Sequence, residues 1–285
     1  LVVSQTFPQS NFLINKFEVE NISSENVNSI FLDKNNFFWI STPEGLNRYD
    51  GSINSIFKSN PFDSTTLSNN LVFETFQIDN KGIYIKSTTR LDYFSYVSNS
   101  FVRTGVSSPI YHTRNEKNLF ISSKNDGVYI FNLNDFTSLN LKFDPRNPLS
   151  ISSSNFNTNQ NQILLEVDDD LWIGTSYGLN KYNLSSNLNK RFYETKDSNT
   201  LNSNYINDLF FVDKKYSSGK IAIANKILAA TQNGLTIINP ENNEINNYES
   251  LKNTNIYNTF SVDDDIIIHS EEGLFVIDKI DESRI

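Results

Sequence analysis

The stretch FFWISTPEGLNRYDG (37–51) is a hydrophobic run, a short polar break and a second, half-polar run. The chain repeats it with few changes as LWIGTSYGLNKYN (171–183), and its two tryptophans, Trp39 and Trp172, place the copies 133 residues apart. Large apolar residues at fixed offsets around a glycine turn predict a β-hairpin. A hairpin that recurs at this distance indicates an internal repeat.

The turn of this hairpin occurs six times when Gly45 is taken as its anchor. The anchors follow one another at intervals of 45, 37, 51, 56 and 39 residues, and they are Gly45, Arg90, Gly127, Gly178, Gly234 and Gly273. A column of large side chains precedes them, formed by Trp39, Tyr84, Phe120, Trp172, Leu228 and Ile267. We expect this column to pack one repeat against the next, and the glycines to supply a positive φ. Arg90 departs from the glycine pattern, so the second turn is expected to have a different shape.

Each repeat contains four β-like runs, which in the first repeat are 27–33, 37–42, 46–50 and 54–59. Four strands in about 40–45 residues is the period of a propeller blade. One such sheet cannot bury both faces alone, whereas a ring of sheets can. The sequence therefore predicts an all-β protein, a β-propeller of four-stranded blades with six repeats, either a six-bladed ring or part of a seven-bladed one. The propeller domain is expected over 12–285, with blades near 25–66, 70–105, 108–145, 160–196, 204–250 and 255–281.

The connections between repeats resemble one another as well. NPFDSTTLSNN (60–70), DPRNPLSISSSN (144–155) and KDSNTLNSN (196–204) are too long for hairpin turns, as expected where the chain crosses from an outer strand to the next inner strand. The sixth repeat has no outer strand of its own, and FLINKFEV (12–19) is expected to close that blade. The insertion KKYSSGKIAIANK (214–226) is expected to lengthen a hairpin of the fifth repeat.

Composition narrows the class of protein further. The chain has 285 residues, 24 basic and 33 acidic, for a net charge of −9, which argues against nucleic acid or anionic membranes as partners. Cysteine is absent, so there is no disulfide framework and no thiol chemistry. No apolar run approaches the roughly 20 residues of a membrane helix. Residues 1–11 are interpreted as a signal-region remnant or N-terminal tail, with cleavage near Ser4–Gln5, so the protein is expected to be exported, periplasmic or extracellular.

Catalytic motifs are not apparent. The sequence has two histidines and no GxSxG, HExxH, P-loop or GxGxxG motif. The acidic triplets Asp168–Asp170 and Asp263–Asp265 fall in equivalent hairpin turns, where turn chemistry accounts for them. We therefore expect a non-enzymatic protein without metal or cofactor. A polysaccharide lyase or hydrolase is a weaker alternative, which would need a carboxylate pair, or a Tyr or His with an Arg, facing the channel.

The repeats FFWISTPEGLNRYDG and DLWIGTSYGLNKYN, with NPFDSTTLSNN after the first, resemble the two-component-regulator propeller repeat. The resemblance covers residues 12–280 and implies the exported sensor region of a hybrid two-component system of Bacteroidetes-type bacteria. It implies binding of oligosaccharides, signalling to a transmembrane kinase and a dimer in that context. Intact members carry two seven-bladed propellers, a β-sandwich, a membrane helix and a kinase. With six repeats, this chain is expected to be a fragment or a stand-alone relative.

The candidate ligand-binding residues follow from propeller geometry. The turns between second and third strands and the linkers open on one face, so this face is expected to carry Glu44, Arg90, Asp126, Tyr177, Asn233 and Glu272. Residues expected at the entry to inner strands are Tyr111, His112, Tyr205 and Tyr257. Arg90 is the leading candidate because its guanidinium presents five donors. Solvated turns and packed tyrosines are the alternative for each residue. The rival function is a protein-binding subunit of an exported or outer-membrane assembly.

Overall fold

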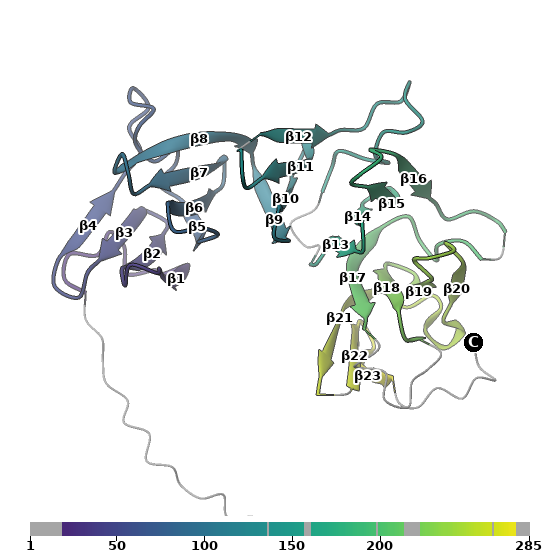
Figure 1. Ribbon diagram of the computed structural model, residues 1–285. Helices are drawn as coiled ribbons and strands as arrows, with labels where there is room; N and C mark the ends of the chain where they lie inside the picture. Colours follow the sequence, from purple (N-terminus) through teal and green to yellow (C-terminus); the bar gives the residue numbers. More distant parts are fainter. Residues whose placement is uncertain are drawn as a thin grey trace, which may run out of the picture. The chain divides into compact units, whose positions relative to one another are not determined.

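The computed structural model describes residues 19–135, 137–156, 161–197, 199–213, 223–263 and 265–277. Within them the strands form six antiparallel sheets, five with four strands and one with three (Figure 1). In every sheet the strands are neighbours in the order in which they follow along the chain. The predicted all-β propeller class is confirmed. Helical structure in this part of the chain is limited to short 3-10 turns, among them η3 (Glu249–Leu251).

The first two sheets occupy the N-terminal part of the described chain. The strands of the first sheet are β1 (Ser29–Leu32), β2 (Phe38–Thr42), β3 (Gly45–Tyr49) and β4 (Asn54–Phe57). The strands of the second sheet are β5 (Val72–Phe76), β6 (Gly82–Ser87), β7 (Arg90–Ser95) and β8 (Ser100–Ser107).

Four further sheets follow. The strands of the third sheet are β9 (Pro109–Arg114), β10 (Asn118–Ser123), β11 (Gly127–Asn132) and β12 (Ser138–Leu141). The strands of the fourth sheet are β13 (Leu164–Val167), β14 (Asp170–Thr175), β15 (Gly178–Asn183) and β16 (Asn189–Phe192). The strands of the fifth sheet are β17 (Ile206–Val212), β18 (Lys226–Thr231), β19 (Gly234–Ile238) and β20 (Ile245–Asn247). The strands of the sixth sheet are β21 (Ile256–Val262), β22 (Asp265–Ser270) and β23 (Gly273–Ile277).

The chain divides into two compact units. Unit 1 comprises residues 1–86 and 93–102, and unit 2 comprises residues 87–92 and 103–285. In unit 1 the core joins the first and second sheets around Trp39, which is fully buried. Its ring stacks on Phe57 at 5.9 Å and meets Phe94 edge-on at 5.2 Å. Aromatic pairs in these geometries add to the stabilisation from area burial alone.

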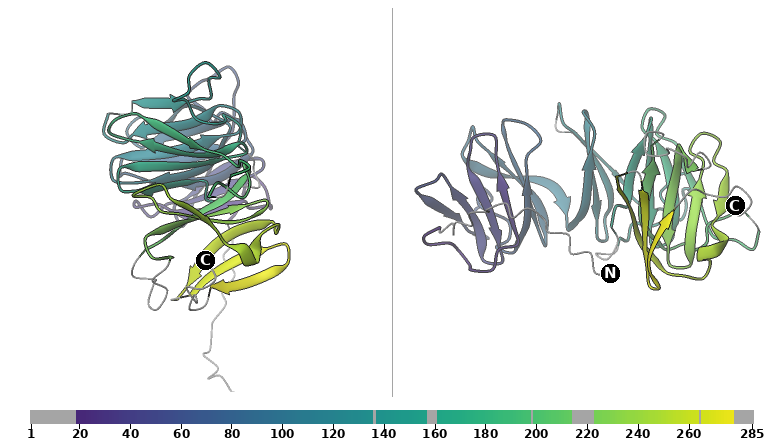
Figure 2. Two further views of the ribbon diagram at one scale, coloured as in Figure 1. Left: turned by 90° about the vertical axis from the view of Figure 1, so that its right-hand side faces the viewer. Right: turned by 90° about the horizontal axis from the view of Figure 1, so that it is seen from below.

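In unit 2 the core consists of apolar layers between consecutive sheets. The sheets of unit 2 follow one another side by side (Figure 2). One apolar layer joins the third and fourth sheets, the next joins the fourth and fifth around Trp172, and a third joins the fifth and sixth. The remaining members of the predicted packing column differ in burial: Tyr84, Phe120 and Leu228 are buried, whereas Ile267 in the sixth sheet is half-buried. A face of one sheet thus covers a face of the next, as repeat architectures require.

Two expectations concern residues that the structure leaves out. The closing strand expected at 12–19 lies outside the described residues except for Val19, and so does most of the insertion at 214–226. Among the described residues, no helix is long and apolar enough to span a membrane.

Candidate ligand-binding face

The turn between the second and third strands of a sheet is built in the same way in several repeats. The hydroxyls of Thr42, Thr175 and Thr231 donate to the carbonyl of the anchor glycine three residues later, at 2.8, 2.8 and 2.7 Å. Each hydroxyl also accepts from the backbone N–H of the residue before that glycine. The last residue before the anchor is therefore held on the surface of the turn. In the sequence, a Ser or Thr three residues before the anchor marks this turn in five of the six repeats.

Arg90 lies in a turn with a different backbone. Gly45 has φ +144, and a Cβ built on it would come within 2.9 Å of the Phe57 carbonyl oxygen, so only glycine fits there. Arg90 is not among the positive-φ residues, although the Ser87 hydroxyl still donates to its carbonyl at 2.9 Å. Its side chain is exposed. The second turn thus has the different shape expected from the missing glycine.

The linkers between sheets are fastened to these turns. The N–H of Gly178 donates to the carbonyl of Asn204 at 2.6 Å, and the N–H of Gly127 donates to that of Ser154 at 3.1 Å. In the fifth sheet the direction is reversed, and the N–H of Asn253 in the linker donates to the carbonyl of Asn233 in the turn at 3.2 Å. Turns and linkers therefore lie at the same end of these sheets, which we call the linker face.

Side chains lock the linkers from within. Asn180 accepts from the N–H of Ser152 at 2.7 Å and donates to the Ser152 hydroxyl at 2.9 Å and to the Ile173 carbonyl at 3.1 Å. In the first sheet Asn47 makes the equivalent bonds to Ser23. Because these groups are buried, the network fixes the linker backbone against the sheet.

Two predicted turn residues, Asp126 and Glu272, have internal partners. Asp126 accepts from Ser107, Tyr129 and Lys142. Burial alone would raise the pKa of the Asp126 carboxyl. The contacts with Lys142, Tyr129 and Ser107 outweigh this effect, and the pKa lies below its ordinary value. Glu272 accepts from the hydroxyl of Thr254 at 3.1 Å. These carboxylates hold the linker face together.

Glu44 and Tyr177 are more open. Glu44 is exposed on the turn of the first sheet. Tyr177 is 63% exposed, and its ring meets that of Tyr193 edge-on at 6.2 Å. Tyr193 belongs to the linker that follows the fourth sheet, so the two rings form an aromatic pair on the linker face of unit 2.

The residues expected at inner-strand entries differ from one another. Tyr111 and His112 lie in the middle of β9, and Tyr111 packs against the core between the third and fourth sheets. Burial, with a smaller contribution from the Asp208 charge, raises the pKa of Tyr111. Tyr205 directly precedes β17. Tyr257 in β21 contacts the imidazole of His269, with ring centroids 5.0 Å apart.

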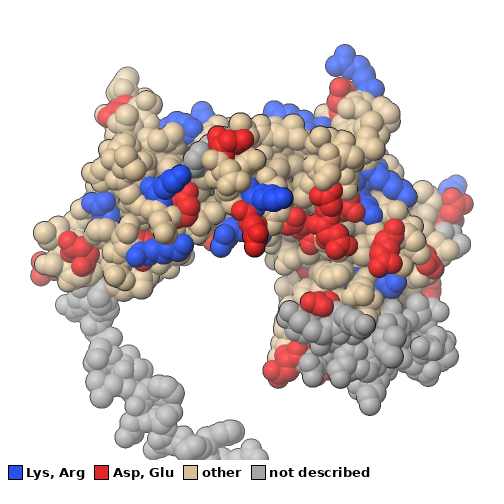
Figure 3. Space-filling view, viewed as in Figure 1, with Lys and Arg blue, Asp and Glu red and all other residues tan. Residues whose placement is uncertain are grey.

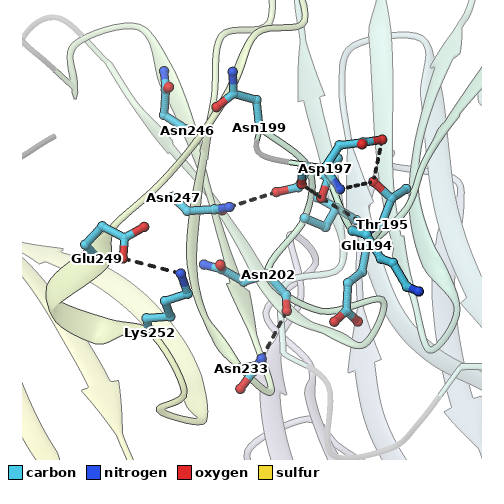
Figure 4. Close-up of a pocket in the computed structure, with 13 residues that line it drawn as sticks. Glu194, Thr195, Asp197, Asn199, Asn202, Asn233, Asn246, Asn247, Glu249 and Lys252 are labelled. Atoms are coloured by element: carbon cyan, nitrogen blue, oxygen red, sulfur yellow. Dashed lines mark hydrogen bonds and ion pairs between the residues drawn. The ribbon is translucent and has the colours of Figure 1, made fainter.

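A cavity of about 630 Å³ opens on the linker face of the fifth sheet (Figure 4). It lies between the linker after the fourth sheet and the outer edge of the fifth. All of its lining residues except Leu201 have polar side chains: Glu194, Thr195, Lys196, Asp197, Asn199, Thr200, Leu201, Asn202, Asn233, Asn246, Asn247, Glu249 and Lys252. Of the predicted site residues, only Asn233 lines it. The other lining residues were missed because their positions depend on how the linker folds over the outer strand.

The side chains around this cavity are partly engaged with one another. Asn247 donates across the cavity wall to the carbonyl of Thr200 at 2.9 Å, and Asn233 donates to that of Asn202 at 3.3 Å (Figure 4). Glu249 and Lys252 form an exposed ion pair at 3.5 Å. Carboxamides offer both donors and acceptors. The cavity therefore suits a ligand with several hydroxyl or amino groups.

A second cavity, of about 450 Å³, lies at the opposite ends of the third and fourth sheets. It is lined by Asp168, Asp169, Glu116 and Glu166 among others, and Asn115 donates to Glu166 at 2.5 Å. In the part of the chain that the structure describes, no three His, Asp or Glu side chains converge as a metal site would require. Basic and acidic side chains are interspersed on the face shown in Figure 3 and form no broad basic patch there.

Consecutive four-stranded antiparallel sheets, packed face to face and joined by linkers at one end, define the β-propeller class. The extracellular domain of the hybrid two component system BT3049 from B. thetaiotaomicron superimposes with a TM-score of 0.50 at 20% identity, over 92% of this chain and 34% of that one. The extracellular domain of the one component system BT4673 from the same organism gives 0.56 at 17% identity, over 88% and 32%. At 20% and 17% identity, the structural similarity to these two domains shows a shared fold alone.

Sequence comparison relates part of the chain to a known family. Residues 21–44 match the family described as two component regulator propeller. Histidine kinase P4 of Formosa agariphila is 36% identical over 69 residues, which are 24% of this chain and 5% of that protein. The match confirms the resemblance to the two-component-regulator propeller repeat for residues 21–44, in the first repeat. The chain spans about a third of the length of the two solved domains.

Proposed function

We propose that this chain is a non-enzymatic recognition region of an exported two-component sensor, and that its linker face binds an oligosaccharide. The family repeat at residues 21–44 supports a sensing role. The similar solved structures are extracellular domains of a hybrid two component system and a one component system, which supports a location outside the cytoplasm, periplasmic or extracellular. Signalling would require an output domain attached to this region, and dimerisation of the sensor would suit such signalling.

The observation that carries the proposal is the cavity of about 630 Å³ with five asparagine side chains in its wall, Asn199, Asn202, Asn233, Asn246 and Asn247. A sugar presents hydroxyls that both donate and accept, and a carboxamide satisfies both roles with one side chain. Glu194, which also lines the cavity, follows directly on Tyr193 of the exposed aromatic pair. Such a ring offers an apolar surface to the C–H face of a neighbouring sugar.

A protein partner is the second candidate, and Phe62 favours it. This side chain is 99% exposed at the tip of the linker between the first and second sheets. The loop beneath it is held by Asn60 donating to the Thr66 hydroxyl at 3.0 Å and by Thr65 donating to Asp63 at 2.9 Å. A bare aromatic ring on a rigid loop is the kind of anchor that protein interfaces bury.

The test is a glycan-array screen of the purified chain followed by calorimetry of each hit. We expect saturable binding of a defined oligosaccharide, and we expect the double variant Asn199→Ala, Asn246→Ala to weaken it about tenfold or more, since each lost hydrogen bond contributes about 0.5–1.5 kcal/mol. Glu241→Ala, an exposed residue at the other end of the fifth sheet, is the control and should bind as the parent does.

Absence of binding to every glycan, with stoichiometric capture of a protein that Phe62→Ala abolishes, would replace the first candidate with the second. Turnover of the bound glycan would contradict the non-enzymatic part of the proposal.

A further inference from the structure

The fourth and fifth sheets provide an internal comparison for the cavity. In the fourth sheet the residue paired with Asn180, two positions after the anchor glycine, is Arg191. In the fifth sheet the residue paired with Thr236, at the same offset, is Asn247. Arg191 and Asn247 are therefore equivalent positions on the two outer strands.

The linkers that cover these positions are equivalent too. Ser150 and Thr200 each precede a buried aliphatic residue, Ile151 and Leu201. The first residue of each linker donates its backbone N–H to a side chain near the end of the same linker. The N–H of Phe143 donates to the Ser154 hydroxyl at 2.7 Å, and the N–H of Glu194 donates to the Asn204 side chain at 2.8 Å. Both acceptors lie three residues after the buried aliphatic residue. Phe143 thus corresponds to Glu194, and Asn147, three residues before Ser150, corresponds to Asp197.

In the fourth sheet the chain fills the space under the linker with its own cation. The Arg191 guanidinium donates to the carbonyl of Ser150 at 2.6 Å, to the Ser150 hydroxyl at 2.5 Å and to the carbonyl of Asn147 at 2.9 Å. It also lies over the ring of Phe143, 5.7 Å from the centroid. A guanidinium satisfies several acceptors at once through its planar fork.

In the fifth sheet the equivalent side chain is too short to do this. Asn247 reaches the carbonyl of Thr200, the counterpart of the Ser150 carbonyl, and the space beyond it is the cavity (Figure 4). The two linker residues around the missing cation have changed as well: Phe143 is replaced by Glu194 and Asn147 by Asp197, and both carboxylates line the cavity. At this position the fifth sheet therefore lacks the cation of the fourth and carries two carboxylates in its place. The lining as a whole holds three acidic residues, Glu194, Asp197 and Glu249, and two basic ones, Lys196 and Lys252.

We propose that this cavity binds a protonated amino sugar, whose ammonium group takes the place that Arg191 holds in the fourth sheet. This inference rests on the proposed function and names the class of sugar. The ammonium would donate to the Thr200 hydroxyl and the Asp197 backbone, with Glu194 and Asp197 supplying the opposite charge. The ring hydroxyls of the sugar would form hydrogen bonds with the asparagines of the wall. A cavity of about 630 Å³ has room for the sugar ring as well as for the ammonium group.

The test compares ligands on one sugar skeleton whose amino group is either free and protonated or acetylated and neutral. Calorimetry in slightly acidic buffer measures binding of glucosamine oligosaccharides and of N-acetylglucosamine oligosaccharides of equal length. We expect the glucosamine series to bind at least tenfold more tightly, and its affinity to fall as salt rises because the contact is between charges.

Two substitutions locate the site. Asn247→Arg restores the side chain of the fourth sheet, so it should abolish glucosamine binding while raising the melting temperature. The matched control is Asn140→Arg in the third sheet, at the same register position opposite Tyr129. Only Ser108 separates β8 from β9, so no long linker precedes this sheet, and Asn140→Arg should change neither quantity.

Three results would overturn the inference. Binding of neutral oligosaccharides with no preference for glucosamine removes the amino-sugar assignment and leaves the proposed function standing. No binding of any oligosaccharide removes both. Binding of an arginine-containing peptide, lost in Asn247→Arg, with no binding of glucosamine would assign the cavity to a protein partner.

Discussion

The two tryptophans occupy equivalent positions but have different polar surroundings. The indole N–H of Trp39 donates to Asp33 at 2.7 Å, and Tyr96 of the next sheet donates to the same carboxylate oxygen at 2.5 Å. The indole N–H of Trp172 is buried and has no hydrogen-bond partner among the described residues. A cation lies over each ring: the Arg48 guanidinium is 5.7 Å from the centroid of Trp39, and the Lys181 ammonium is 5.3 Å from that of Trp172.

This difference predicts unequal costs for the same substitution. Trp39→Phe loses similar apolar area to Trp172→Phe but also removes a buried hydrogen bond to a carboxylate, so it should lower the free energy of unfolding by about 1–3 kcal/mol more. Urea unfolding followed by circular dichroism measures both values. Equal costs for the two variants would show that the Asp33 contact adds nothing.

At the scale of the strand, Asp208 in β17 connects three sheets. It accepts from the N–H of Gln162, just before β13, at 2.9 Å, and from the N–H and hydroxyl of Thr259 in β21 at 2.9 and 3.1 Å. The side chain is 2% exposed, and burial raises the pKa of its carboxyl in spite of these donors. The native state therefore binds this proton more tightly than the unfolded chain does.

The direction of the pH effect follows. The stabilisation from a raised carboxyl pKa is present below the unfolded-state pKa and is lost as pH rises through the folded-state value. The free energy of unfolding of the parent, minus that of Asp208→Asn, should increase as pH falls from neutral. Urea titrations of both proteins over a pH series give this difference. A constant difference, or one that decreases on acidification, would contradict the raised pKa.

The sheets could be predicted from the sequence because the period of their apolar columns survives in every repeat. Trp39, Leu228 and the anchor glycines mark hairpins whose partners are near in sequence. The cavity could not be predicted in the same way. It depends on Asn247 being shorter than Arg191, and that comparison needs the register of β16 and β20 and the path of the linkers. Of the predicted face, Asn233 and Tyr177 lie near it, while Tyr111 is a packing residue.

At the scale of the molecule, the two units each contain one tryptophan, Trp39 in unit 1 and Trp172 in unit 2. Repeat proteins gain stability mainly from contacts between neighbours, so the units need not unfold together. In Trp172→Phe the fluorescence reports unit 1 alone, and its urea transition should not coincide with the circular dichroism transition of the same variant. Coincident transitions in both single-tryptophan variants would indicate one cooperative unit.

The central claim is that the linker face of the fifth sheet is where this propeller recognises its ligand. Hydrogen–deuterium exchange of the chain, with and without a saturating oligosaccharide from the screen, tests it most directly. The account predicts that the ligand slows exchange in the linker segments 194–197 and 199–202 and at Asn246, Asn247, Glu249 and Lys252, which line the cavity. Protection confined to other segments, with these residues unchanged, would contradict it.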